Sequence, residues 1–373
     1  MSLLTHFRRD LEQFFFRDRD PHAIPSMDGA FSPNQELDRA APIGEPLEGA
    51  DAVAEAPDGA LFVSAGKTIW RLSGDGYRDR AKFAAFDSNV GALAFDRSNE
   101  RLLVCTARGL AVLDREGRTT STLEEAEGEP LRCLTAVAAA PHGGIFLSQG
   151  SSNHEAEDWR VALMELDATG RIVVCGPTLE DARTLTRALS YPAGLAVIDS
   201  WLWFTESFAH RLSRTRITHP ATAAAPEIVI KNLPGYPSRL SGSAKGDLWL
   251  SLFALRTHLV EFVLCEDDFR LEMMRTVPQP YWVAPALSSG KDCLEPLQVG
   301  GLRALGVEKP WAPPRSYGLA ARLDEDGEVV ETLHSRVGGK HHGVTAAIET
   351  SQGVILVSKG SGRVLLYRSD DRE

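Results

Sequence analysis

Two adjacent histidines, His341 and His342, are well suited to proton transfer, because an imidazole titrates near neutral pH. They directly precede an apolar run, VTAAIET, so one ring can point toward whatever that run lines, or both can lie in an exposed loop. A second polar stretch, SSNHEAEDW at residues 151–159, also holds acid–base groups, but its composition favours a solvated hairpin loop. No GxSxG, P-loop or HExxH motif occurs in the sequence.

A recurring phrase forms the scaffold for these groups: a short apolar run, a glycine-bearing turn and a second apolar run. It occurs six times, in segments that begin at Gly49, Val90, Leu134, Tyr191, Tyr236 and His342. Units of this kind, mostly about 40 to 60 residues apart, are typical of propeller blades that bury their faces against their neighbours. Turns such as Asp58-Gly59 sit between the two runs, as in β-hairpins. The sequence therefore predicts an all-β fold, a six-bladed β-propeller spanning residues 31–373.

Two segments depart from this phrase. Residues 1–30 predict an amphipathic helical segment, which packs on the propeller or on a second subunit or else contacts a membrane; the lack of a basic face favours packing. An insertion at about residues 254–316, between blades five and six, predicts a helix that ends at Pro278. The stretch that follows contains Tyr281, Trp282 and Trp311, and it either covers one face of the propeller or pins a long crossover to the outer surface.

Composition excludes several classes of protein. The chain has 373 residues, 43% hydrophobic content and a formal charge of -11, which disfavours a nucleic-acid binder. No stretch is long enough to span a bilayer, and the first residues lack the apolar core of a signal peptide, so we expect a cytoplasmic protein. The five cysteines form no CxxC pair, which predicts buried free thiols instead of a zinc site or disulfides.

Several segments resemble a known family. YPAGLAV, WLWFTESFAHRLSRTRI and NLPGYPSRLSGSAKGDLWLSL are similar to the strictosidine synthase-like branch of six-bladed propellers, which is related to the gluconolactonase, regucalcin and paraoxonase families. SYGLAARLDEDGEVVETL extends the likeness toward the last blade, so that it covers most of the chain. The resemblance implies a central channel. In the metal-dependent relatives, residues at the start of several blades hold a divalent cation there, usually a Glu in the first blade and Asn or Asp in later ones.

This sequence departs from that ligand pattern. Asp51 can still bind a cation, but Thr135, Ala193 and the pair Ser238-Arg239 stand where the resemblance implies the other ligands. A guanidinium is always charged and would repel a cation, so we predict no metal cofactor. We expect Arg239 to pair with Asp51. It then either offers a bidentate grip to a carboxylate or phosphate of a ligand, or only closes the channel.

Three functions follow as hypotheses. The first is a metal-independent hydrolase that cleaves a lactone or ester of a small anionic molecule, with the catalytic residues His341, His342 and Asp51. Its ligand-binding residues would be Arg239, Ser238, Thr135, Tyr281 and Trp282. The second is a non-catalytic propeller that binds a small anionic metabolite or a partner protein. The third is an enzyme that condenses an amine with an aldehyde, as strictosidine synthase does. That enzyme carries a catalytic glutamate in its last blade. The corresponding stretch here has only Glu349, which lies near the hairpin end, so this function is disfavoured.

Overall fold

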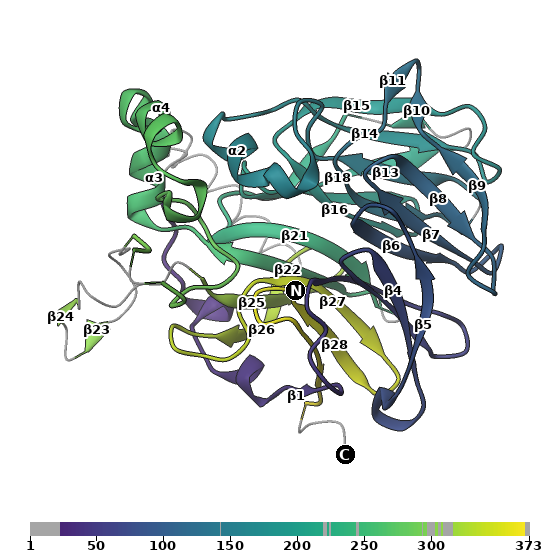
Figure 1. Ribbon diagram of the computed structural model, residues 1–373, viewed down its shortest axis with the longest axis horizontal. Coiled ribbons are helices and arrows are strands. Elements are labelled where there is room, and N and C mark those ends of the chain that lie inside the picture. Colours follow the sequence, from purple (N-terminus) through teal and green to yellow (C-terminus); the bar gives the residue numbers. More distant parts are fainter. Residues whose placement is uncertain are drawn as a thin grey trace.

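Most strands of the described residues belong to six antiparallel sheets, the blades, which surround a common centre (Figure 1). The computed structural model describes residues 23–141, 143–218, 222–223, 225–243, 246–292, 294–296, 303–304, 307–308 and 316–369. Each sheet has four strands, and the fourth sheet carries an additional short strand. This arrangement confirms the predicted six-bladed β-propeller.

In every blade, the three inner strands follow one another in chain order from the centre of the propeller outward. The innermost strands are β2 (Ala50–Glu55), β6 (Val90–Asp96), β12 (Leu134–Ala139), β16 (Pro192–Ile198), β21 (Gly235–Gly242) and β27 (Val344–Thr350). The second strands are β3 (Leu61–Ala65), β7 (Arg101–Thr106), β13 (Ile145–Gln149), β17 (Trp201–Glu206), β22 (Leu248–Leu255) and β28 (Gly353–Ser358). The third strands are β4 (Thr68–Ser73), β8 (Gly109–Leu113), β14 (Gly170–Cys175), β18 (Arg211–Thr218), β25 (Gly318–Leu323) and β29 (Arg363–Tyr367).

The outermost strands complete the blades. They are β5 (Asp79–Ala85), β9 (Thr119–Leu123), β15 (Arg183–Leu189), β20 (Glu227–Ile230), β26 (Val329–Ser335) and, in blade six, β1 (Ala41–Pro42). Because β1 pairs with β29, with Ala41 opposite Leu366, segments from both ends of the chain share one sheet and close the ring. Short strands outside the blade ladders are β10 (Glu125–Ala126), β11 (Glu129–Pro130), β19 (Thr222–Ala223), β23 (Arg303–Ala304) and β24 (Val307–Glu308).

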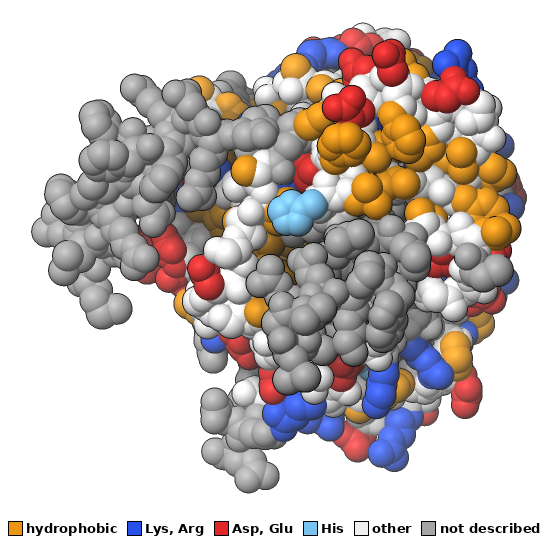
Figure 2. Space-filling view, turned by 90° about the vertical axis from the view of Figure 1, so that its left-hand side faces the viewer, with side chains coloured by type: hydrophobic (Ala, Val, Ile, Leu, Met, Phe, Trp, Pro, Cys, Tyr) orange, Lys and Arg blue, Asp and Glu red, His pale blue; other side chains and the backbone are white. Residues whose placement is uncertain are grey.

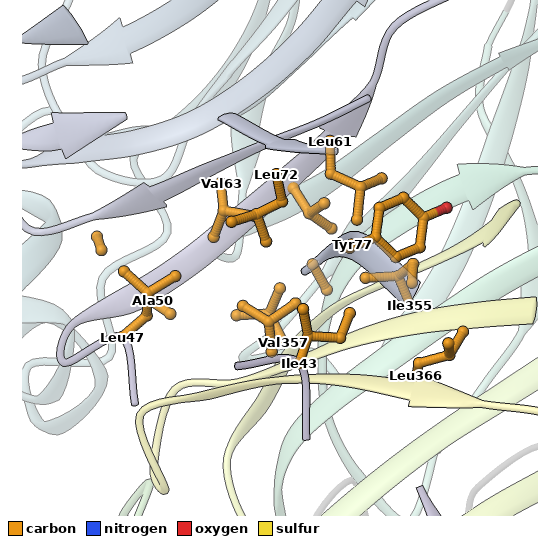
Figure 3. Close-up of a cluster of buried hydrophobic side chains, with 14 residues drawn as sticks. Ile43, Leu47, Ala50, Leu61, Val63, Leu72, Tyr77, Ile355, Val357 and Leu366 are labelled. Atoms are coloured by element: carbon orange, nitrogen blue, oxygen red, sulfur yellow. The ribbon is translucent and has the colours of Figure 1, made fainter. Parts of the chain in front are cut away.

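The hydrophobic core is divided among the interfaces between neighbouring blades. Figure 3 shows the cluster between blades six and one, where Leu61 and Val63 of β3 meet Ile355 and Val357 of β28. The other five blade interfaces hold corresponding clusters of buried side chains. Both faces of a blade are therefore apolar, which is why the second strands read as nearly continuous hydrophobic runs instead of alternating ones.

The insertion contains two helices, α3 (His258–Cys265) and α4 (Asp267–Thr276), followed by the 3-10 turn η5 (Gln279–Tyr281). The sequence predicted one continuous helix, but Glu266 adopts a non-helical conformation and separates two helices. The insertion connects β22 to β25, so it lies within blade five, one step earlier than the position between blades five and six that the sequence suggested. The sequence pattern did not separate the third strand of blade five from its fourth, which explains the difference.

A shorter helix, α2 (Trp159–Met164), lies in the connection between β13 and β14 of blade three, after the 3-10 turn η4 (Ala156–Asp158). It contacts α4, and side chains of α2 and of the insertion form one buried hydrophobic cluster (Figure 1). Figure 2 views the molecule from the side on which α3 and α4 lie, and hydrophobic side chains gather over its upper part. No helix within the described ranges is long and apolar enough to cross a membrane.

The remaining short turns are η1 (Gly29–Phe31), η2 (Glu36–Arg39) and η3 (Asp75–Tyr77). Most of the predicted N-terminal helix, residues 1–22, lies outside the described residues, as do Trp311 and Cys293. Three other cysteines, Cys105, Cys133 and Cys175, are buried free thiols as expected, whereas Cys265 is exposed on α3.

Candidate ligand-binding site

Each innermost strand contains a register shift near its first residues. In blade one, Ala50 pairs with Ala65 but Val53 pairs with Val63, so that β2 holds one residue more than β3 between these pairs. The other five innermost strands show the same shift. Such bulges release backbone groups from the ladder and redirect side chains. The positions that lie within the shifts include Asp51, Gly91, Thr135, Ala193, Ser238, Arg239 and Thr345.

A repeated four-residue pattern in the second strands supports these bulges. The six copies are LFVS, LLVC, IFLS, LWFT, LWLS and ILVS, and each ends in a small polar or thiol side chain that is fully buried: Ser64, Cys105, Ser148, Thr205, Ser251 and Ser358. Buried polar groups need partners, and several of these bond to bulged backbone. The Ser64 hydroxyl accepts from the Ala52 amide (2.9 Å), and the Ser251 hydroxyl donates to the Thr345 carbonyl (2.9 Å).

A pocket of about 350 Å³ opens where the innermost strands begin, and we call it the upper pocket. The innermost strands contribute Asp51, Thr135, Ser238, Arg239 and Thr345 to its lining. The connections between second and third strands contribute further side chains, because these hairpins reach the same end of the channel: Ala107, Glu155, Glu157, Trp159 and Lys359. Leu287 shows that the insertion reaches this pocket too.

The floor of the upper pocket is a cluster of three charged side chains. One carboxylate oxygen of Asp51 lies 2.9 Å from Nη1 of Arg239, and the other lies 2.9 Å from Nζ of Lys359. Burial by itself would raise the pKa of Asp51, but the charges of Arg239 and Lys359 outweigh it and hold that pKa well below its ordinary value. Asp51 is therefore a carboxylate with both oxygens engaged, which makes it a poor general base.

The ion pair of Asp51 and Arg239 was expected from the sequence, whereas the second cation, Lys359, was not. The two terminal nitrogens of Arg239 make further bonds to protein oxygens, whereas its Nε is buried without a hydrogen-bond partner among the described residues. Nη1 also donates to the Asp51 carbonyl (3.0 Å), and Nη2 donates to the Gly91 carbonyl. With these contacts made within the protein, the geometry favours the channel-closing role of Arg239 over the bidentate grip on a ligand.

Two predicted ligand-binding hydroxyls line the upper pocket but point to backbone. Thr135 Oγ1 donates to the Pro192 carbonyl (2.6 Å), and Ser238 Oγ donates to the Thr345 carbonyl (3.1 Å). Both side chains are buried, so their first role here is to satisfy carbonyl groups at the bulges.

With Arg239 and Lys359 in place, the channel does not offer a free ligand set for a divalent cation. Asp51 is the carboxylate at its floor, and two cations already occupy its oxygens, while Ala193 has no ligand atom at all. Within the described part of the chain, no three side chains of His, Cys, Asp or Glu converge on a common point. A divalent ion beside Arg239 and Lys359 would meet two like charges. The residues present therefore do not fit the metal that the resemblance to metal-dependent propellers implies.

His341 and His342 do not line the upper pocket, which corrects the expectation that one ring points into the channel. Nδ1 of His342 lies 2.8 Å from the Ser316 hydroxyl, and its Nε2 lies 2.9 Å from the Arg336 carbonyl. Since a carbonyl only accepts, Nε2 carries the proton and Nδ1 accepts from Ser316. Burial lowers the pKa of both histidines, so they are held neutral as structural groups.

The same region anchors the insertion to blade six, which explains why the histidines turn away from the channel. A side chain at Gly343 or Gly360 would collide with the Leu287 carbonyl, at 2.7 and 1.8 Å from an added Cβ. Ser316 also bonds to Ser289 (2.8 Å), so the middle of the insertion and its last residues are tied at this point. The sequence KHHG thus fixes the insertion to the rim of the channel.

Tyr281 and Trp282 lie outside the upper pocket as well. The Trp282 indole is buried and donates to the Val277 carbonyl (2.8 Å), and the Tyr281 hydroxyl donates to Asp292 (2.7 Å). These contacts stay within the insertion, so these two aromatic residues stabilise it and do not cover the channel. The aromatic lining of the pocket comes instead from Trp159, Tyr191 and Phe253, and the Trp159 ring meets Phe253 edge to face at 5.1 Å.

Sequence reasoning missed Lys359, Glu155 and Trp159 as pocket residues. A signal existed, because each follows a second strand of the repeated phrase, and such hairpins all point to the same end of the channel. Glu155 was noted only as part of a solvated loop. Its carboxylate makes no hydrogen bond or ion pair with a described residue, whereas Glu157 accepts from the Asn89 amide (2.8 Å).

The fold and this pocket define a six-bladed propeller with a charged floor in its central channel. A family model described as strictosidine synthase matches residues 136–220. Two Arabidopsis thaliana proteins, STRICTOSIDINE SYNTHASE-LIKE 13 and 3, are 24% and 25% identical, each over 66% of this chain. The matched segments span 55% and 57% of those proteins, a little over half of their length.

Solved structures give the same fold. A gluconolactonase from Xanthomonas campestris has a TM-score of 0.56 at 12% identity and covers 87% of this chain and 96% of its own. A regucalcin from Agrobacterium tumefaciens, described as a calcium-binding protein, has a TM-score of 0.55 at 12% identity, over 87% and 95% of the two chains. The chain is thus a six-bladed propeller similar in sequence to strictosidine synthase-like proteins, as the sequence predicted. At this identity, the solved structures inform the fold alone.

Proposed function

We propose that the upper pocket binds a small organic anion through Lys359. The supporting observation is the difference in exposure among the three charged floor residues: the Lys359 side chain is 37% exposed, against 15% for Arg239 and 14% for Asp51. The ammonium group is therefore the cation that a ligand can reach. A volume of about 350 Å³ suits a small metabolite.

The charges around the pocket restrict the ligand further. Asp51, Arg239 and Lys359 together leave one net positive charge at the floor. Glu155 and Glu157 add negative charge elsewhere in the lining. A second negative charge on the ligand would be repelled there, so a monocarboxylate fits better than a dicarboxylate or a phosphate dianion.

Thermal shift and calorimetric titration with a panel of small monocarboxylates, each paired with its neutral amide, test this proposal. We expect acids to bind and amides not to. Lys359→Met should weaken binding by about 10- to 100-fold, because a charge-assisted hydrogen bond is lost. Lys67→Met is the matched control, since Lys67 lies in the corresponding hairpin of blade one and does not line the pocket. Equal affinity of wild type and Lys359→Met for every acid would refute the proposal.

Metal-independent hydrolysis of a lactone or ester is the second candidate. Glu155 favours it, because an unengaged carboxylate on the pocket wall can accept a proton from water. The test probe is a gluconolactone, suggested by the gluconolactonase fold relatives. Glu155→Gln should abolish hydrolysis while leaving acid binding intact. Turnover that survives this substitution would remove Glu155 from the mechanism.

Amine–aldehyde condensation has less support, because Glu349 lies near the opposite end of β27 and does not line the pocket. A cytoplasmic site of action stays a prediction. The free thiols of Cys105, Cys133 and Cys175 agree with it, since reducing compartments keep thiols unpaired.

A further inference from the structure

Oxygen atoms from three other blades surround the guanidinium of Arg239. Nη1 donates to the Asp51 carboxylate (2.9 Å) and to the backbone carbonyls of Asp51 (3.0 Å) and Thr345 (3.4 Å). Nη2 donates to the Gly91 carbonyl. The side chain thus reaches from β21 of blade five to β2, β6 and β27, across the channel.

The backbone conformation of the innermost strands brings these oxygens together, and the identity of the side chain between them is not needed for it. Asp51, Gly91 and Thr345 each lie within the register shift of their strand, where a bulge releases carbonyl groups from the ladder. One carboxylate and three backbone carbonyls form the kind of all-oxygen set that binds a hard cation. Hydroxyl groups also donate to two of these carbonyls, from Thr345 to Asp51 (2.7 Å) and from Ser251 to Thr345 (2.9 Å), but Arg239 supplies the positive charge that hydroxyls lack.

We propose that the channel contains a cation site formed by Asp51, Gly91 and Thr345, and that the Arg239 guanidinium is its permanent occupant. A cation attached to the chain replaces the free divalent ion that the resemblance to metal-dependent propellers implies. Two consequences follow. The channel is organised without a metal, and the site becomes able to take up a free cation once the Arg239 side chain is removed.

This inference is independent of the proposed function. Ligand binding was assigned to Lys359, which contacts Asp51 through its other carboxylate oxygen and none of the three carbonyls. Arg239 itself offers a ligand little, because its Nε is buried and its Nη atoms contact protein oxygens. Failure of one proposal therefore leaves the other standing.

The test is chemical rescue of Arg239→Ala. We expect a lower Tm than wild type, and recovery of a substantial part of the loss on adding about 10 mM guanidinium or calcium at constant ionic strength, because a ligand of the native state stabilises it. Sodium serves as the ionic-strength control. Wild type should respond to neither cation, and a chelator should leave its Tm unchanged.

Arg211→Ala is the matched control. Arg211 forms a bidentate pair with the buried Glu206 (2.6 and 2.8 Å), and no backbone carbonyl accepts from its guanidinium among the contacts of the described residues. Its loss should lower the Tm without rescue by either cation. If Arg239→Ala does not accumulate as folded protein, its soluble yield after refolding from urea with and without guanidinium gives the same comparison, and Arg239→Lys, which keeps a positive charge, should fold unaided.

Three results would overturn the proposal: no response of Arg239→Ala to guanidinium or calcium in either format, equal rescue of Arg211→Ala, or a fall in the Tm of wild type on chelation. The first would show that the oxygens do not form a cation site. The second would show a nonspecific effect of the cation, and the third would show that a metal is already bound.

Discussion

The two ends of the central channel are lined by the same six strands but differ in chemistry. At the upper end, bulges expose carbonyl groups and charged side chains. At the lower end, a chamber of about 490 Å³ is lined by regularly paired residues, many of them alanines: Ala54, Ala94, Ala139, Ala196 and Ala347. Arg239 borders both spaces, so it forms the partition between them. Regular pairing builds the ring, and interruptions of that pairing build the site.

Replacing one carboxylate at each end of β2 should give the largest difference in stability between the two ends of the channel. Asp51→Asn leaves the largely buried Arg239 without its counter-charge, so we expect a loss of about 3–5 kcal/mol in the free energy of unfolding. Glu55→Gln, at the lower end, removes only an exposed pair with Arg97 and should cost less than about 1 kcal/mol. Urea denaturation of both variants measures the difference, and equal losses would contradict it.

The pH dependence of stability should also distinguish Asp51 from other buried titratable groups. The folded-state pKa of Asp51 lies below its ordinary value of 3.8, so its contribution to stability is complete above that value and is lost as the pH falls through the folded-state pKa. Buried His334, whose pKa burial lowers to about 4, acts in a different window, because its contribution is lost as the pH falls from about 6.5 to 4. Asp51→Asn should therefore flatten only the more acidic part of the stability profile.

The regularly paired blades could be predicted from the sequence, whereas the candidate site could be predicted only in part. The six-fold phrase predicted the blades, because apolar runs and turns are local signals. The pairing of Asp51 with Arg239 was expected from the resemblance to metal-dependent propellers, which places both residues at the starts of innermost strands. Lys359 and the outward direction of His342 were not predicted, because they depend on where a hairpin tip and the insertion meet in space. The insertion's Leu287, packed at Gly343 and Gly360, turns the KHHG segment into an anchor, and no local pattern encodes that contact.

Removing a serine hydroxyl at each end of the channel should give a smaller difference in stability. Ser251→Ala should cost about 1–2 kcal/mol, because the buried Thr345 carbonyl loses its shortest hydrogen bond and keeps only the longer ones from Ser238 (3.1 Å) and Arg239 (3.4 Å). Ser241 makes a similar bond to the Ala347 carbonyl (2.6 Å), but it lines the lower chamber and is partly exposed. Ser241→Ala should therefore cost well below 1 kcal/mol. A larger loss for Ser241→Ala than for Ser251→Ala, measured by urea denaturation, would contradict this account.

The smallest effect is expected where the ladder is regular and water has access. Ala94 of β6 is partly exposed and lines the lower chamber. Ala94→Ser adds a hydroxyl that the solvent can hydrate, so the free energy of unfolding should change by no more than about 0.5 kcal/mol. Monocarboxylate binding at the upper pocket should also be unchanged, because Arg239 separates the two spaces. A weakened affinity in Ala94→Ser, at unaltered stability, would show that the two ends of the channel communicate across Arg239, and the partition would then be a coupling element instead of a barrier.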